Sequence, residues 1–143
     1  YLNEGIAEYH KRLQKYISFK QETIPELKRQ KGLSELELKT REGQEILSRL
    51  KTSDIVALLD ENGKSFNSFQ FAKHVQKRMN AGSKRIVFIV GGAYGFSEDV
   101  YKRANEKIAL SEMTFSHQMV RLFFTEQIYR AFTILRNEPY HHQ

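Results

Sequence analysis

The 143-residue chain has no cysteine and no tryptophan, only two prolines, and no long apolar run. Without cysteine it cannot form a disulfide framework, a thiolate zinc site or a cysteine nucleophile, and the absence fits a reducing compartment. No apolar stretch approaches the roughly 20 residues that cross a bilayer, and no signal-peptide pattern opens the chain. We therefore expect a cytoplasmic protein with no membrane partner.

Bulky and charged side chains are both present in quantity. Ten phenylalanines and seven tyrosines supply core material, and 143 residues suit a single domain over 1–143. The 23 basic and 17 acidic side chains give a formal net charge of +6. The basic excess is shared by both halves of the chain, with no basic tail, which permits an RNA or DNA partner without requiring one.

Hydrophobic periodicity predicts helices and strands in alternation. The expected helices cover 2–16, 34–50, 71–82, a segment that Ser97 caps, and 116–136, and the expected strands cover 17–23, 55–59, 85–90 and 108–111. Gly43 lies inside the second helix and predicts a weak point there. The last helix is expected to bury Phe123, Ile128 and Phe132. Alternation of this kind is typical of an α/β fold with a mainly parallel sheet and helices on both faces.

Three strand ends are candidates for a ligand site, because open parallel sheets bind ligands at the carboxyl ends of their strands. They are 59–63, 91–95 and the stretch after Leu110. Gly91 and Gly92 would let a ligand approach backbone amides that a Cβ would block, and the alternative is a tight turn. The glycines fit neither the dinucleotide fingerprint nor the P-loop, which disfavours a dehydrogenase or a nucleotidase.

The histidines and arginines give weaker indications. His10 and His74 are expected on solvated helix faces. His117 and Arg121 are four residues apart and would share a face that suits an anion, although a solvated stripe with carboxylate partners is the alternative. His141 and His142 are adjacent and cannot face one way on a helix or strand, so we expect no metal site.

Three motifs together carry a specific resemblance. They read I-V-G-G-A-Y-G at 89–95, L-S-E-M-T-F-S-H-Q-M-V-R at 110–121, and E-Q-I-Y-R-A at 126–131 followed by P-Y-H at 139–141. With the segment E-Y-H-K-R-L at 8–13, the chain closely resembles the RlmH (YbeA-type) family over nearly its whole length. Members of that family are bacterial methyltransferases that modify N3 of a pseudouridine in 23S ribosomal RNA.

The resemblance implies a SPOUT fold with a C-terminal trefoil knot, a homodimer, and S-adenosylmethionine bound in the knot. It implies a short strand and turn before the first helix, so roughly a dozen residues are expected to precede Tyr1 in the family pattern. The residues expected to hold the cofactor are Leu59, Gly91, Leu110, Ser111, Glu112, Met113, Thr114 and Phe115. The candidate RNA contacts are Arg121, Arg136, Tyr140, His141 and His142, the last replacing the basic residue usual in the family.

Little side-chain chemistry is required of such an enzyme, because a sulfonium methyl group is already electrophilic. The base N3 must lose its proton, which a neutral His141 could accept, while Tyr140 could stack on an unpaired base. These two residues are the expected catalytic pair. The alternative function is a non-catalytic ribosome-binding assembly factor on the same fold, against which the intact glycines and the intact stretch after Leu110 argue.

Overall fold

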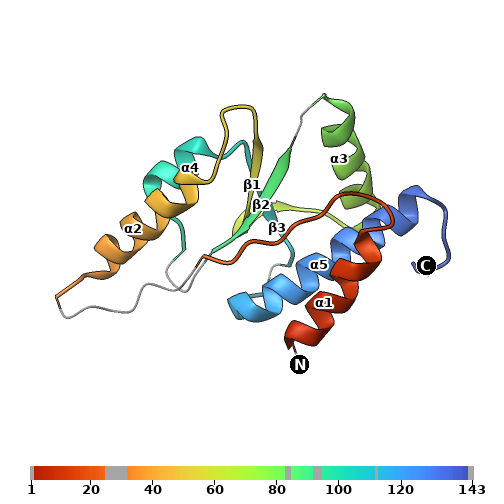
Figure 1. Ribbon diagram of the computed structural model, residues 1–143, viewed down its shortest axis with the longest axis horizontal. Coiled ribbons are helices and arrows are strands. Elements are labelled where there is room, and N and C mark those ends of the chain that lie inside the picture. Colours follow the sequence, from red (N-terminus) through yellow and green to blue (C-terminus); the bar gives the residue numbers. More distant parts are fainter. Residues whose placement is uncertain (1, 25–31, 83–84, 92–94, 112, 142–143) are drawn as a thin grey trace.

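A three-stranded parallel sheet lies at the centre of the computed structural model, which describes residues 2–24, 32–82, 85–91, 95–111 and 113–141. Its strands are β1 (Ile55–Ser65), β2 (Ile86–Val90) and β3 (Glu106–Ala109), in the order β2-β1-β3. Helices lie on both sides of the sheet (Figure 1). The helices are α1 (Leu2–Leu13), α2 (Glu35–Ser48), α3 (Ser68–Asn80), α4 (Glu98–Arg103) and α5 (His117–Leu135). The α/β class and the parallel sheet are confirmed.

Polar caps start four of the helices. The hydroxyls of Ser34, Ser97 and Ser116 accept hydrogen bonds from backbone N–H groups three residues on, at the first turns of α2, α4 and α5. Asn67 and Gln70 form a reciprocal capping box at α3. Each cap satisfies an amide that the helix itself leaves unpaired, which fixes where the element begins.

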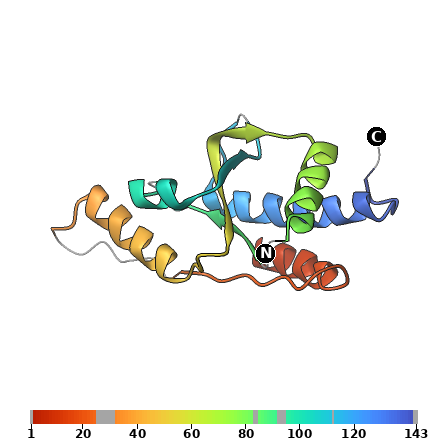
Figure 2. The same ribbon diagram turned by 90° about the horizontal axis from the view of Figure 1, so that it is seen from above.

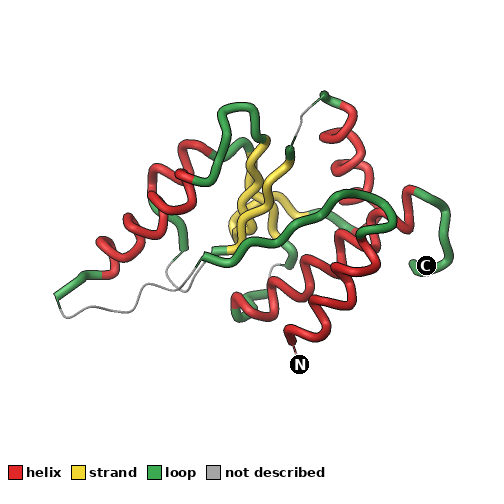
Figure 3. The backbone as a smooth tube through the Cα atoms, in the orientation of Figure 1, coloured by secondary structure: helices red, strands yellow, loops and turns green. Residues whose placement is uncertain are grey.

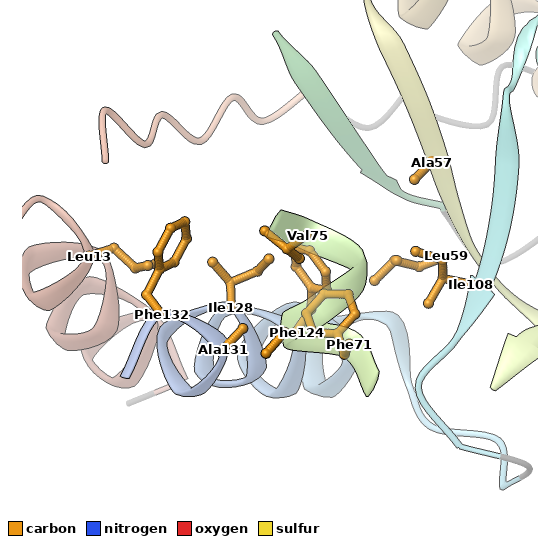
Figure 4. Close-up of a cluster of buried hydrophobic side chains, with 11 residues drawn as sticks. Leu13, Ala57, Leu59, Phe71, Val75, Ile108, Phe124, Ile128, Ala131 and Phe132 are labelled. Carbon is orange, nitrogen blue, oxygen red and sulfur yellow. The ribbon is translucent and has the colours of Figure 1, made fainter. Parts of the chain in front are cut away.

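The larger core lies between the sheet and α1, α3 and α5 (Figure 4). Helices α1 and α5 run side by side in the same direction, as Figures 1 and 2 show. Tyr9 contacts Tyr129 near the middle of the pair, and Tyr16 stacks on Phe132 towards its end. Leu13 is fully buried between them. Phe124, not the predicted Phe123, faces this core, and the Phe123 side chain is 37% exposed.

The smaller core lies on the other side of the sheet, under α2 and α4, and contains Val56, Leu58, Phe96 and Val100. A Cβ on Gly43 would lie 2.2 Å from the Ser97 hydroxyl oxygen. Gly43 is therefore not the predicted weak point. Helix α2 is continuous through it, because only a glycine lets α2 approach the start of α4 so closely.

Several boundaries differ from the prediction. The first helix ends at Leu13, and residues 17–23 form no strand. Instead, the Phe19 carbonyl oxygen accepts hydrogen bonds from the side chains of His10 and Gln14, 2.9 and 2.8 Å away. Strand β3 begins at Glu106, two residues early, because Glu106 pairs with Ala57 of β1. The tube in Figure 3 shows the extended path of 17–24 beside the helices.

Some predictions concern residues outside the described ranges, namely Gly92, Glu112 and His142. Within the described ranges, none of the helices has the length and apolar character that crossing a membrane requires.

Candidate functional site

The carboxyl ends of the three strands meet at one edge of the sheet. Leu59 pairs with Val90 on one side and with Ile108 on the other, so these residues form one row across the sheet. Gly91 follows Val90 directly in the chain, and Leu110 lies two residues after Ile108. The three candidate strand ends therefore lie side by side in the sheet.

The first strand end is a bulge rather than the predicted simple turn. Leu59 and Lys64 both pair with Ile108, so residues 60–63 (the β1 bulge) are looped out of the pairing. Gly63 makes this possible, because a Cβ there would lie 2.6 Å from the Ile108 backbone nitrogen. Bulges of this kind redirect side chains next to functional sites.

Asp60 organises the bulge through two hydrogen bonds. Its Oδ1 accepts from the Asn62 backbone N–H at 2.8 Å, and its Oδ2 accepts from the Tyr101 hydroxyl at 2.5 Å. Burial, reinforced by the bond to Asp60, raises the pKa of Tyr101 to about 12. A hollow of about 520 Å³ borders Asp60, Asn62, Tyr101 and residues 104–107.

The third strand end is the segment 110–116, called the third loop below. Thr114 Oγ1 donates a 2.8 Å hydrogen bond to Glu61 Oε2, which ties this loop to the β1 bulge. The Ser111 hydroxyl accepts from the Met113 backbone N–H at 3.0 Å. Met113 and Phe115 are exposed, at 71% and 37%. The loop is thus held by polar contacts and presents apolar side chains outwards.

Gly91 is required by packing. A Cβ on Gly91 would lie 3.0 Å from the nearest ring carbon of Phe96, which belongs to the smaller core. The space that a Cβ on Gly91 would enter is bordered by the Phe96 ring, so it is not open to a ligand. The observation favours the tight-turn alternative on this side of Gly91.

At the start of α5, His117 is exposed and Arg121 is half-buried. The Nε atom of Arg121 is buried without a hydrogen-bond partner among the described residues. Arg136 lies beyond the other end of the helix, with its guanidinium 5.8 Å from the centre of the Tyr16 ring. Since a 19-residue helix is about 28 Å long, the two arginines are not brought together.

The predicted catalytic pair folds back along the second half of α5, in a tail cluster that consists of Tyr9, Glu126, Arg130, Tyr140 and His141. The Tyr140 hydroxyl donates to Glu126 Oε1 at 3.0 Å and lies 3.2 Å from the Tyr9 hydroxyl. The Arg130 guanidinium lies 4.9 Å from the centre of the Tyr140 ring, and its Nη1 is 2.8 Å from His141 Nδ1. Burial, with the bonds to Tyr9 and Glu126, raises the pKa of Tyr140 above its ordinary value.

Sequence reasoning did not single out Tyr9, Glu126 or Arg130 as functional. The spacing of four between Glu126 and Arg130 indicates an ion pair, and they form one at 2.6 Å. Nothing local connects Tyr9 to Tyr140, which is 131 residues away.

Two histidines differ from expectation. His74, expected to be solvated, lies 2.7 Å from a carboxylate oxygen of Glu106, which also accepts from Arg78 at 3.1 Å. His10 is likewise bonded to the Phe19 carbonyl. In the ranges that the structure describes, no three histidine or carboxylate side chains are grouped as a metal site.

A family model described as predicted SPOUT methyltransferase matches residues 1–141. The chain belongs to this family. The resemblance that the motifs indicate is thereby confirmed.

Relatives with similar sequences carry the name ribosomal RNA large subunit methyltransferase H. The protein of this name from Christiangramia forsetii is 64% identical over 138 residues, which cover 96% of this chain and 88% of the relative. The one from Flavobacterium johnsoniae is 60% identical with the same coverage. The one from Parabacteroides distasonis is 58% identical over 143 residues, covering 100% of this chain and 91% of the relative.

Proposed function

We propose that this chain is an S-adenosylmethionine-dependent methyltransferase that acts in the cytoplasm on N3 of a pseudouridine in ribosomal 23S RNA. The observation that carries the proposal is the meeting of three strand ends at one edge of the sheet, with the third loop tied to the β1 bulge. The relatives' name, which specifies methylation of large-subunit ribosomal RNA, supports the substrate class.

The residues at the strand ends suit the chemistry of the cofactor. Leu59, Gly91 and residues 110–115 would hold it, with exposed Met113 and Phe115 offering apolar surface for an adenine ring. Asp60 and Glu61 place two carboxylates at the same edge, which suits a cationic sulfonium group. When bound, S-adenosylmethionine supplies an electrophilic methyl group.

Arginine and tail residues would contact the RNA. Arg121 has a buried guanidine N–H that finds no acceptor among the described residues, so a phosphate oxygen would satisfy it. We assign the substrate base to Tyr140 and His141, with Arg136 and His142 as further contacts.

We propose a homodimer, as the family resemblance implies. Within one chain the tail cluster is bonded to Glu126, nine residues or about 14 Å along α5 from His117 at the start of the helix. A second copy of the chain would bring its own tail residues to the strand ends of the first. The exposed aromatic pair Phe115 and Phe123, with ring centres 5.1 Å apart, offers apolar surface for that contact.

We also propose the trefoil knot that the family resemblance implies. The third loop crosses from β3 to the β1 bulge, where Thr114 meets Glu61, before α5 begins. Such a crossing brings the segment after β3 over the end of β1, as threading of the chain requires.

Three measurements test the proposal. Purified bacterial ribosomes lacking the modification are incubated with the protein and S-adenosylmethionine, and the nucleosides are identified by mass spectrometry. We expect N3-methylated pseudouridine, and its absence would contradict the assigned reaction. Calorimetric titration with S-adenosylmethionine separates the enzyme from a non-catalytic assembly factor, which would bind ribosomes without binding the cofactor. Light scattering should give twice the chain mass, and a monomer would contradict the dimer.

A further inference from the structure

We propose that Arg130 is a positioning residue that holds His141 as the neutral imidazole with its proton on Nε2. His141 then donates a hydrogen bond to a carbonyl oxygen of the substrate base, instead of accepting the proton of N3. This inference rests on the proposed function, in which the tail contacts the base. It replaces the general-base role that the sequence alone favours for His141.

The protonation of His141 follows from the partner of its Nδ1. A guanidinium has only donors, and Arg130 Nη1 lies 2.8 Å from His141 Nδ1. Nδ1 must therefore accept, which it does only when it carries no proton. A neutral imidazole with an unprotonated Nδ1 carries its proton on Nε2. An imidazolium carries a proton on Nδ1 as well, so its N–H would point at the Arg130 N–H and no hydrogen bond could form.

Arg130 is held so that it keeps this orientation. Its Nε and Nη2 both donate to Glu126 Oε1, at 3.0 and 2.6 Å, which leaves Nη1 for His141. The Tyr140 ring lies under the guanidinium, and the Tyr140 hydroxyl donates to the same Glu126 oxygen. The Arg130 and Glu126 side chains are only 24% and 17% exposed, so solvent competes weakly for these bonds.

The remaining nitrogen of His141 is prepared to donate. Nε2 is buried and has no hydrogen-bond partner within the described part of the chain, while Phe69 contacts the imidazole edge-on with ring centres 4.9 Å apart. A buried N–H without an acceptor is unfavourable, and a carbonyl oxygen brought by a ligand would remove that cost.

A pyrimidine imide offers such an acceptor on each side of N3. Once the N3 proton has left to water, the negative charge spreads over N3 and the two neighbouring carbonyl oxygens. An N–H donor placed at one of those oxygens stabilises that charge, as the donors of an oxyanion hole do. His141 therefore favours the ionised base without taking its proton.

Two substitutions of His141 separate the roles. The amide nitrogen of glutamine can take the place of Nε2–H as a donor, but glutamine cannot act as a base. We expect His141→Gln to keep kcat within about tenfold of the unmodified protein, and His141→Ala to lose about 100-fold. Equal losses in both variants would overturn the donor role. Methylation by the unmodified protein is measured alongside. Its absence would contradict the proposed function, whereas equal losses in the two variants contradict only the donor role of His141.

Nitrogen-15 NMR of histidine-labelled protein gives a readout independent of activity. The His141 signals, assigned by their loss in His141→Gln, should show a protonated Nε2 and an unprotonated Nδ1 at neutral pH. Arg130→Met should remove this preference, and Arg130→Lys, which keeps a donor, should restore part of it. Arg49→Met is the matched control, because Arg49 forms the same i,i+4 pair with Glu45 on α2. A protonated Nδ1, or no effect of Arg130→Met, would overturn the inference even if methylation is observed.

Discussion

The two sides of α5, its start and its second half, differ in how far their polar groups are bonded to one another. At its start, His117 is exposed, and the Arg121 Nε has no acceptor among the described residues. Along its second half, Glu126, Arg130 and Tyr140 are joined by hydrogen bonds and by a guanidinium over an aromatic ring, although His141 Nε2 has no partner among the described residues. The start of the helix therefore leaves its groups for ligands to satisfy, while most polar groups of the second half are organised before any ligand arrives.

This difference follows from what each end packs against. The start of α5 adjoins the third loop, whose side chains Met113 and Phe115 face outwards. The tail cluster packs against α1, which contributes Tyr9, and Tyr16 lies nearby in the turn after that helix. Preorganised donors are effective in catalysis because they need no rearrangement during the reaction. The predictions below perturb one end at a time.

The largest effect is expected for Gly63→Ala, which perturbs the strand-end side. The new Cβ would lie 2.6 Å from both the Ile108 nitrogen and the Lys107 carbonyl carbon, and these backbone atoms cannot move aside without breaking the β1–β3 pairing. We expect the free energy of unfolding in urea to fall by about 3 kcal/mol. Cofactor binding should be lost with it.

Gly5→Ala is the control for Gly63→Ala. Its Cβ would lie 3.0 Å from Leu122 Cδ1, the tip of a flexible side chain that can rotate away. Alanine also favours the helix, so the free energy of unfolding should change by less than about 1 kcal/mol. A Gly63→Ala protein as stable as Gly5→Ala would contradict the geometry of the β1 bulge.

The next effect concerns the tail cluster. Tyr140→Ala removes the ring under Arg130 and the donor to Glu126, which frees His141 from its fixed position. Losing contacts worth roughly 1–3 kcal/mol should slow methyl transfer at limiting ribosome by about 5- to 150-fold. Affinity for S-adenosylmethionine, measured by calorimetry, should stay nearly unchanged.

Tyr140→Phe keeps the ring but loses both hydroxyl contacts, so its methyl transfer should fall between that of the unmodified protein and that of Tyr140→Ala. If Tyr140→Ala instead weakens cofactor binding, the two ends of α5 are coupled and their separation is wrong.

A smaller effect is expected for Arg121→Gln. Because the buried Arg121 Nε has no partner among the described residues, a phosphate contact there would release one counterion on binding. The slope of log K against log salt concentration for ribosomal RNA should become about one unit shallower. Arg49→Gln serves as the comparison, because Arg49 pairs with Glu22 and Glu45 and has no proposed RNA contact. Equal slopes for Arg121→Gln and the unmodified protein would exclude the phosphate contact.

The sequence is sufficient to predict the sheet and most helices. Buried parallel strands need apolar residues at consecutive positions, and 55–59 and 86–90 have them. Capping serines mark the helix starts at Ser34 and Ser97 because their hydroxyls satisfy free amides. The strand-end edge of the site follows from the parallel order alone.

The rest depends on contacts between distant segments. Residues 60–63 have the composition of a turn, and only the approach of β3 to Gly63 makes them a bulge within a longer strand. The strand pattern at 17–23 has no neighbouring strand in the described sheet, and the side chains of His10 on α1 and of Gln14 just after it bond the Phe19 carbonyl instead. Local periodicity carries no information about which distant segment will be the partner.

The smallest effect concerns alkaline pH at the tail side of α5. The Tyr16 hydroxyl donates to Glu138 Oε2 at 2.5 Å, and burial together with this bond raises the pKa of Tyr16 from 10.0 to about 12. A group whose pKa is raised by folding contributes stability that is present below its unfolded pKa and is lost as pH rises through its folded pKa. Tyr16 should therefore stabilise the protein fully below pH 10.0 and progressively less up to about pH 12. Tyr16→Phe has no such titration, so its melting temperature should fall less across this interval.

Tyr101→Phe is the matched variant at the strand ends, where burial and the bond to Asp60 likewise raise the Tyr101 pKa to about 12. We expect the two variants to differ from the unmodified protein by similar amounts in melting temperature across this interval. If, in addition, only Tyr16→Phe preserves the histidine NMR signals of the tail at high pH, the two sides of α5 respond to pH separately. The same dependence of melting temperature on pH in all three proteins would show that neither hydroxyl bond contributes to stability.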